Sequence, residues 1–348
     1  MLAVALAALV IACASCSTVG YYAQAVHGHF ALLAAAKPIP VWLDDPATPE
    51  DLKQRLLRAQ QIRTFASREL GLPDNRSYTA YADLKRPAAV WNVFAAPELS
   101  LQLKTWCYPF FGCAGYRGYF DKGDAEKLAD ELRRDGYEVN VGVVPAYSTL
   151  GWFDDPLLNT FINQGDGELA RLIFHELAHQ IAYAKDDTAF NESFATTVER
   201  VGVRRWLAAE GDEATRAAYA LQQERREDFL GLLREFRNLL AANYARDVSD
   251  DEKRTRKREI FAELQQAYAK VKAERWGGWG GYDRYFAQSL NNAHLAAVGA
   301  YNDLVPNFEA LLRAEGGDLP RFYLRVKKLA SEDRAARTKA LEEVLTTP

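Results

Sequence analysis

The sequence predicts an α+β fold in which a small mixed sheet is followed by a mostly helical C-terminal part. Three observations carry this prediction. Segments rich in Tyr, Val, Trp and Phe, which favour strands, cluster between residues 77 and 144. Apolar residues recur at helical spacing before and between these segments. From residue 201 onward the helical spacing continues without a comparable strand signal.

The first residues are expected to be a signal peptide over 1–15. Residues 1–14 are nearly all Ala, Leu, Val and Ile, and they are fewer than the roughly 18 apolar residues that a membrane span needs. No basic residue precedes them. The segment Ala-Ser-Cys-Ser around Cys16 resembles a bacterial lipobox, whose cysteine is acylated, and the segment ending at Cys13 fits the same pattern.

Two further cysteines, Cys107 and Cys113, stand in a turn-rich segment. In an exported protein they can pair as a disulfide, because the periplasm is oxidising. Two free buried thiols are the alternative, since sequence does not show Cβ geometry. A zinc knuckle lacks the further Cys or His ligands that it needs.

The predicted elements before residue 145 follow from periodicity. Leu52, Leu56 and Ile62 recur at helical spacing, and residues 137–144 alternate between apolar and other residues as a strand does. The expected order is a helix over 49–70, strands over 77–84, 88–95 and 116–120, a helix over 123–135 and a strand over 137–144.

Residues 172–181, Leu-Ile-Phe-His-Glu-Leu-Ala-His-Gln-Ile, contain the pattern H-E-x-x-H. On a helix His175 and His179 lie one turn apart on one face, where two imidazoles can bind one Zn²⁺. Glu176 lies beside that face, where its carboxylate can take a proton from a water on the metal. The surrounding residues are uncharged, so the helix is expected to be buried, and burying these three groups unpaired would be costly.

A catalytic zinc usually has three protein ligands and one water. A polar turn at 185–187 precedes a second expected helix over 191–199, which carries Glu192 and Glu199 seven residues apart on one face. Both are candidates for the third ligand.

Asn191-Glu192-Ser193-Phe194-Ala195 resembles the N-E-x-F-A segment of the membrane alanyl aminopeptidases, which are gluzincin metallopeptidases. The resemblance implies a zincin-like core with Glu192 as the ligand. Twelve residues separate His179 from Glu192, whereas about eighteen usually separate the second His from the metal-binding Glu in gluzincins. Glu199 lies at the spacing found in thermolysin. The metzincin pattern is absent, because Ala182 and Lys185 stand where it has Gly and His.

Most of the chain also resembles a bacterial family of predicted aminopeptidases that are lipid-anchored, including the segments 20–24 and 116–120. The resemblance implies a zinc-dependent aminopeptidase with one Zn²⁺ and a peptide substrate, held on a membrane of the bacterial cell envelope and facing the periplasm. It favours Cys16 as the acylated residue, because family-like sequence follows it. The G-x-M-E-N segment that recognises a free α-amino group in the alanyl group is absent.

The predicted strand over 137–144 runs into Pro145 and a short segment before the metal helix. Zincins bind the substrate backbone along an edge strand beside this helix, so the resemblance makes the segment a candidate substrate strand. An ordinary loop is the alternative. The residues concerned are Tyr147, Ser148, Thr149, Leu150 and Gly151.

The C-terminal part is expected to be a helical region over 201–348, packed on an α+β zincin-like region over 16–200. Gluzincins use a Tyr or His to stabilise the oxyanion that forms on the substrate carbonyl. Tyr301 is the first candidate, in competition with Tyr282, Tyr285 and His294. For His294 a surface or structural role is the simpler interpretation.

The net charge is −4 and no basic cluster alternates with aromatic residues, so a nucleic-acid partner is not expected. Membrane contact is expected from the lipid rather than from the protein surface. The predicted function is a zinc metallopeptidase with Glu176 as general base. The alternatives are a non-catalytic envelope lipoprotein with structural zinc, a zinc endopeptidase and a zinc-dependent amide hydrolase.

Overall fold

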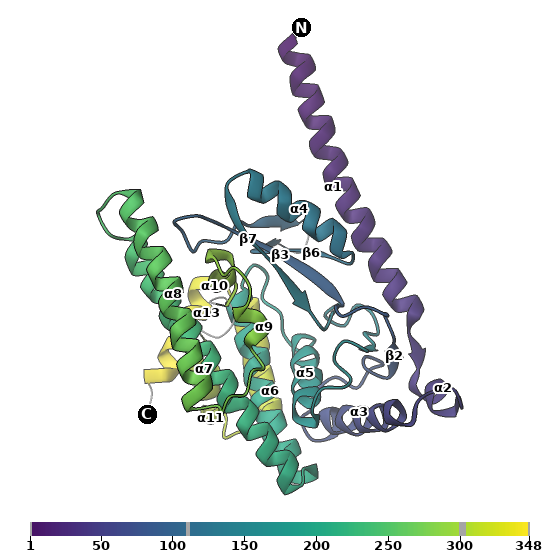
Figure 1. Cartoon of the computed structure of the whole chain (residues 1–348). Helices are drawn as coiled ribbons and strands as arrows, with labels where there is room; N and C mark the ends of the chain where they lie inside the picture. The colour runs from purple at the N-terminus through teal and green to yellow at the C-terminus, as the bar shows by residue number, and fades with distance from the viewer. Residues whose placement is uncertain (1, 109–111, 299–303, 347–348) are drawn as a thin grey trace.

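The computed structural model describes residues 2–108, 112–298 and 304–346 of the chain. Long helices alternate with short strands, and the second half is helical (Figure 1). The α+β prediction is therefore confirmed. In chain order the elements are α1 (Leu2–Ala35), β1 (Lys37–Pro38), α2 (Ile39–Asp44), α3 (Glu50–Arg68), β2 (Ala80–Ala82), β3 (Val90–Pro97), β4 (Trp106–Tyr108), β5 (Gly112–Ala114), β6 (Arg117–Tyr119), α4 (Lys122–Arg134), β7 (Tyr137–Val144), β8 (Leu157–Leu158), α5 (Asp166–His179), α6 (Thr188–Glu210), α7 (Glu213–Tyr244), α8 (Asp250–Glu274), α9 (Asp283–Phe286), α10 (Asn292–Val298), α11 (Val305–Ala314), α12 (Leu319–Ser331) and α13 (Arg334–Thr346).

The larger sheet has the strand order β6-β3-β7 and is antiparallel. Side chains alternate along a strand, so β3 has two buried faces. Trp91 and Val93 pack in one cluster with Ala129 of α4, whereas Phe94 packs in another with Ala293 of α10. The sheet therefore lies between α4 and α10.

The second sheet, β1-β2-β8, is much shorter than the sequence predicts. The strand expected over 77–84 is reduced to the three residues of β2. Tyr78 has a φ of 66° and Lys85 a φ of 54°, and such left-handed residues do not continue a strand. The predicted strands at 88–95, 116–120 and 137–144 are present as β3, β6 and β7.

The main hydrophobic core surrounds α5. Ile62 of α3, Phe174 of α5, Phe194 of α6, Phe308 of α11 and Phe322 of α12 are all fully buried in it. Helices from both ends of the chain thus pack on the same core. The domain boundary expected at residue 200 falls inside α6, which continues unbroken to Glu210.

A second core lies between α7 and α8, whose facing residues include Leu233, Leu240, Ile260 and Leu264. Figure 1 shows these two long helices side by side along the edge of the molecule. The segment 246–258, which contains charges of both signs, mostly forms the first turns of α8, which begins with a capping box at Ser249.

The β4–β5 hairpin places Cys107 opposite Cys113, and the two form a disulfide. The backbone N–H of Cys113 donates a hydrogen bond of 2.9 Å to Asp186, in the loop between α5 and α6. The hairpin is therefore fixed to the loop that joins the two helices of the candidate metal site.

Helix α1 projects from the body at its N-terminal end and lies against β6 and β2 at its C-terminal end (Figure 1). Within the described residues, no helix combines the length and the apolar character needed to cross a membrane.

Candidate metal centre

The candidate site is built on α5 and α6 and on the loop between them. Helix α5 ends at His179, earlier than the apolar run to Ala184 suggests, and the chain turns through residues 180–187. The side chain of Asn191 accepts a hydrogen bond of 2.7 Å from the N–H of Ala184 and donates one of 2.8 Å to its carbonyl. This closes the loop and fixes the first turn of α6, so that Glu192 returns to the end of α5.

Three side chains converge at this point. The Nε2 atoms of His175 and His179 are 3.1 Å apart. Glu192 Oε2 lies 3.4 Å from the Nε2 of His175, and Glu192 Oε1 lies 3.8 Å from the Nε2 of His179. The donor atoms of the three residues all lie within 4.8 Å of one another, as a shared metal ion requires.

These distances agree with a tetrahedral Zn²⁺ site. Ligand atoms about 2.1 Å from a tetrahedral ion lie about 3.4 Å from one another. The measured separations of 3.1, 3.4 and 3.8 Å bracket that value. Two imidazole nitrogens and a carboxylate are also a ligand set that zinc accepts in catalytic sites. The residues therefore fit the metal that their sequence pattern implies.

Glu199 contacts the other side of the His175 ring. Its Oε2 lies 2.8 Å from Nδ1 of His175, so it accepts the Nδ1 proton and leaves Nε2 free to bind a metal. Glu199 also accepts a hydrogen bond of 3.1 Å from Arg171, one turn earlier on α5. Of the two candidate carboxylates, Glu192 therefore faces the convergence point and Glu199 lies behind it.

The pKa values reflect this arrangement. Burial opposes the charge of His175, but hydrogen bonds with Glu192 and Glu199 raise its pKa to about 10. Burial and the charge of His175 lower the pKa of His179 to about 4. Burial opposes the charge of Glu199 as well, yet Arg171 and His175 hold its pKa at about 2. The His179 Nδ1 atom is buried without a hydrogen-bond partner among the described residues.

Glu176 lies close to this group and has the opposite shift. Burial raises its pKa to about 7, and the negative charges of Glu192 and Asp155 add to the effect. Ser148 hydrogen bonds Glu176 and opposes the shift. A carboxyl group poised near neutral pH is suited to taking up and releasing protons.

The predicted substrate segment, residues 147–151, is not a strand, because β7 ends at Val144 just before Pro145. It is a loop held by Asp155, whose carboxylate accepts hydrogen bonds of 2.9 Å from the N–H and 2.8 Å from the hydroxyl of Thr149. The loop nevertheless lies beside Glu176, through Ser148. Its place next to the site agrees with the expectation, whereas its conformation does not.

The predicted oxyanion donors are mostly elsewhere. Tyr301 lies outside the described residues. Tyr282 and Tyr285 pack around Phe229 in the α7–α8 core, and His294 is buried, with Nδ1 2.9 Å from Asn291. A surface role for His294 is therefore wrong, and its role is structural.

Tyrosines that the sequence did not single out lie near the site. Burial and the charge of Glu192 raise the pKa of Tyr116 to about 12, and Glu176 also contributes. Burial and the charge of Glu176 raise the pKa of the fully buried Tyr78. Tyr116 precedes β6, about fifty residues before the start of α5, so no local pattern could have linked it to the metal helix.

The chain was compared with known protein families. Residues 20–341 match the family model described as "Putative aminopeptidase". The chain belongs to this family. No curated protein and no solved structure matches it. Membership of an aminopeptidase family supports a peptidase enzyme, and the predicted relationship at this level is confirmed.

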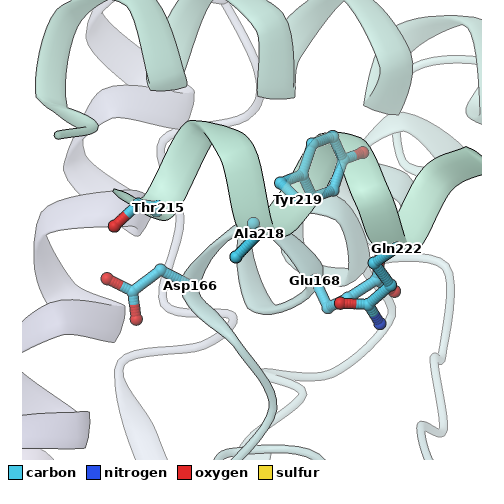
Figure 2. A pocket seen from close by; sticks show the side chains of 7 residues that line it. Asp166, Glu168, Thr215, Ala218, Tyr219 and Gln222 are labelled. Atoms are coloured by element: carbon cyan, nitrogen blue, oxygen red, sulfur yellow. The ribbon is translucent and has the colours of Figure 1, made fainter. Parts of the chain in front are cut away.

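In this member of the family the site is linked to a hollow at the start of α5. The hollow has a volume of about 320 Å³ and lies between α5 and α7 (Figure 2). Glu168 lines it and accepts hydrogen bonds of 2.8 Å from both Arg171 and Gln223. A chain of contacts thus runs from the hollow through Arg171 to Glu199. The lining residues are Asp166, Gly167, Glu168, Thr215, Ala218, Tyr219 and Gln222.

Proposed function

We propose that the protein is a zinc-dependent metallopeptidase, acting as an aminopeptidase, in which His175, His179 and Glu192 bind one Zn²⁺. The observation that carries the proposal is the convergence of two Nε2 atoms and one carboxylate, at tetrahedral separations, directly beside Glu176. Membership of the aminopeptidase family supports a peptide substrate.

The roles of the side chains follow from their contacts. A bound Zn²⁺ supplies a Lewis acid for the peptide carbonyl and an acidified water. Glu176 accepts the proton of the attacking water and passes it to the departing amine, for which a pKa near 7 is suitable. Glu199 holds the His175 ring with Nε2 facing inward, and Arg171 keeps Glu199 charged.

The substrate is proposed to lie along the loop of residues 147–151, which reaches Glu176 through Ser148. An oxyanion donor is expected from a tyrosine. Tyr301 remains the sequence-based candidate. Tyr116 is a second candidate, because the charges of both Glu192 and Glu176 act on its hydroxyl group.

Export and acylation of Cys16 are a separate part of the proposal, with the enzyme attached to the cell envelope and facing the periplasm. Mass spectrometry of the N-terminal peptide of the protein isolated from its own membranes tests this part. A diacylglyceryl group on Cys16 supports it, and an unmodified Cys16 contradicts it.

Hydrolysis is tested with matched substrates. The zinc-loaded protein is given short peptides with a free N-terminus and the same peptides acetylated at that end. Stepwise release of N-terminal residues from the free peptides alone supports an aminopeptidase. Internal cleavage of both sets indicates an endopeptidase. Zinc bound in a 1:1 ratio with no hydrolysis of any peptide or simple amide contradicts the enzyme and favours structural zinc.

A further inference from the structure

Between residues 19 and 34 the exposed side of α1 is mostly apolar. Val19, Tyr22, Val26 and Phe30 are 67%, 37%, 55% and 55% exposed. Their spacing of three, four and four residues places them on one stripe of the helix. Among the exposed residues from 19 to 34, the His27 ring and the Tyr22 hydroxyl are the only polar side-chain groups, and no residue is Asp, Glu, Lys or Arg. From Val19 to Phe30 this stripe is about 17 Å long at the helical rise.

The opposite side of α1 is fixed to the protein. Gln24 donates a hydrogen bond of 3.4 Å to the carbonyl of Gly118 and accepts one of 3.2 Å from the N–H of Phe120. Gly28 lies directly on the Phe120 ring, where a Cβ atom would come within 2.2 Å of it. Leu32 is buried in the main core. The stripe therefore cannot turn inward, because the docked side holds the helix in place.

The stripe continues onto a neighbouring loop. The Phe153 ring lies 6.3 Å from that of Phe30, and Trp152 is 80% exposed. A hydrogen-bonded turn holds both residues, since Thr149 accepts hydrogen bonds from the N–H groups of Trp152 and Phe153. An indole held out in water by a rigid turn is unfavourable unless it has an apolar partner.

We infer that Val19, Tyr22, Val26, Phe30, Trp152 and Phe153 form a lipid-facing patch that dips into the surface of a phospholipid bilayer. The position of the stripe and its lack of charge favour a bilayer over a protein partner. The stripe begins three residues after Cys16, the proposed site of acylation, and the stretch from 16 to 36 contains no Asp, Glu, Lys or Arg. An apolar helix lying in the interface buries its face about 5–10 Å into the lipid.

The composition of the patch agrees with a bilayer surface. Trp and Tyr favour the interface between lipid and water, because their rings have an apolar body and a polar edge. Asp154, which follows Phe153 in the chain, forms an ion pair with Arg76 at 3.3 Å. By contrast, α8 begins Asp-Asp-Glu-Lys-Arg-Thr-Arg-Lys-Arg, a run in which Lys257 alone is buried, as expected for a helix with one side in water.

This contact differs from a lipid on Cys16, which would tether the protein without fixing its orientation. The patch fixes the orientation, and it brings the bilayer to the loop that carries Ser148 beside Glu176. The inference concerns membrane contact alone and holds whether or not the proposed hydrolysis is found.

The test measures whether Trp152 enters the bilayer. The full-length chain is reconstituted in phosphatidylcholine and phosphatidylglycerol vesicles, with and without lipids brominated near the top of the acyl chain. The emission of Trp152 is obtained as the difference between the protein and Trp152→Phe, which keeps an aromatic ring. Trp279, 37% exposed beside the α7–α8 core, serves as the control through Trp279→Phe.

We expect the emission of Trp152 to shift to shorter wavelength in vesicles and to fall at least about twofold with brominated lipid, whereas that of Trp279 does not change. Unquenched emission from Trp152 on vesicle-bound protein overturns the inference. So does a shift that appears without lipid and grows with protein concentration, because that identifies a second copy of the chain as the partner.

A pair of charge variants links this signal to α1. Val26→Glu combined with Phe30→Glu should abolish the quenching of Trp152 while the circular dichroism spectrum stays unchanged. Leu324→Glu, at a residue of α12 that is 69% exposed, introduces a carboxylate elsewhere and should leave the quenching intact. Equal quenching in the double variant and the unmodified protein overturns the assignment of the patch.

Discussion

Two buried polar clusters of this protein use similar residue types in opposite ways. In the α5–α6 cluster of His175, His179 and Glu192, three potential ligand atoms lie together, and their lone pairs converge when His175 loses its Nε2 proton. In the β7–α8 cluster of Glu138, Lys257 and Asn292, each donor meets an acceptor. Convergent lone pairs are costly to bury unless a cation joins them, whereas matched donors and acceptors stabilise the fold by themselves.

The β7–α8 cluster illustrates complete pairing. Asn292 donates to the carbonyls of Pro97, Glu98 and Ser100 at 3.0, 2.8 and 3.0 Å, and its side-chain oxygen accepts from Tyr244 at 2.7 Å. Lys257 donates to the Glu98 carbonyl and forms an ion pair with Glu138. Nothing in this cluster needs a ligand. The comparison shows that buried charge marks a candidate site only where its pairing is incomplete.

The largest effect should come from Glu176→Gln, which removes the proposed base without removing a ligand. We expect hydrolysis to fall by a factor of about 10² to 10⁴ while zinc content stays at one ion per chain. Steady-state kinetics and atomic absorption measure the two quantities. Glu263→Gln, on the surface of α8, is the matched control and should change neither. Loss of zinc from Glu176→Gln would make Glu176 a ligand instead of the base.

Zinc affinity should separate the two carboxylates of α6. Glu192→Gln replaces the proposed ligand, so we expect an affinity loss of more than about 100-fold. Glu199→Gln weakens the support of the His175 ring and should cost about 10- to 100-fold. Competition with a chromophoric chelator measures both variants under the same conditions. A larger loss for Glu199→Gln would exchange the roles of the two residues.

The difference between these carboxylates also shows how far sequence can predict the site. The H-E-x-x-H pattern and the helical period predict His175, Glu176 and His179, and the resemblance to the N-E-x-F-A segment predicts Glu192. The contact of Glu199 with Nδ1 depends on how α6 rotates against α5, which no local pattern encodes. Arg171 stands four residues before His175, and a charge at that position of an apolar helix was the one available sign of a partner.

The fold was predictable to a similar extent. The alternation of apolar and other residues predicted the bounds of β7 as they are observed. Helical spacing of apolar residues predicted the ends of α3 and α4 to within a residue or two. Tyr78 combines a left-handed backbone, which ends β2 early, with a buried ring, and neither feature leaves a mark in the composition. The outer face of α1 was missed for another reason. An apolar segment read alone does not show which of its sides the protein will cover.

A substitution in the β7–α8 cluster should lower the stability of the fold without changing zinc affinity. Lys257 is 7% exposed, so Lys257→Met leaves Glu138 without its ion-pair partner. We expect the free energy of unfolding to fall by about 1–3 kcal/mol, with unchanged zinc affinity. Lys272→Met breaks a surface ion pair with Asp283 and should cost less than about 1 kcal/mol. Urea denaturation in the presence of zinc distinguishes the two, and equal costs would contradict complete pairing as the source of stability.

The smallest effect concerns two buried histidines that share a pKa of about 4 for different reasons. Burial alone lowers that of His294, whereas His179 also feels the charge of His175. In the unfolded chain the His294 imidazole titrates near pH 6.5. Between pH 6.5 and 4 the unfolded chain therefore binds more protons than the folded one, and the free energy of unfolding falls as the pH is lowered. With zinc present, His294→Phe should therefore lose less stability than the unmodified protein between pH 7 and 5, by about 1–2 kcal/mol in urea titrations. An unchanged slope would mean that His294 becomes hydrated before it is protonated. Burial thus lowers the pKa of both histidines. His179 differs from His294 because its ring lies together with two other potential metal ligands, His175 and Glu192.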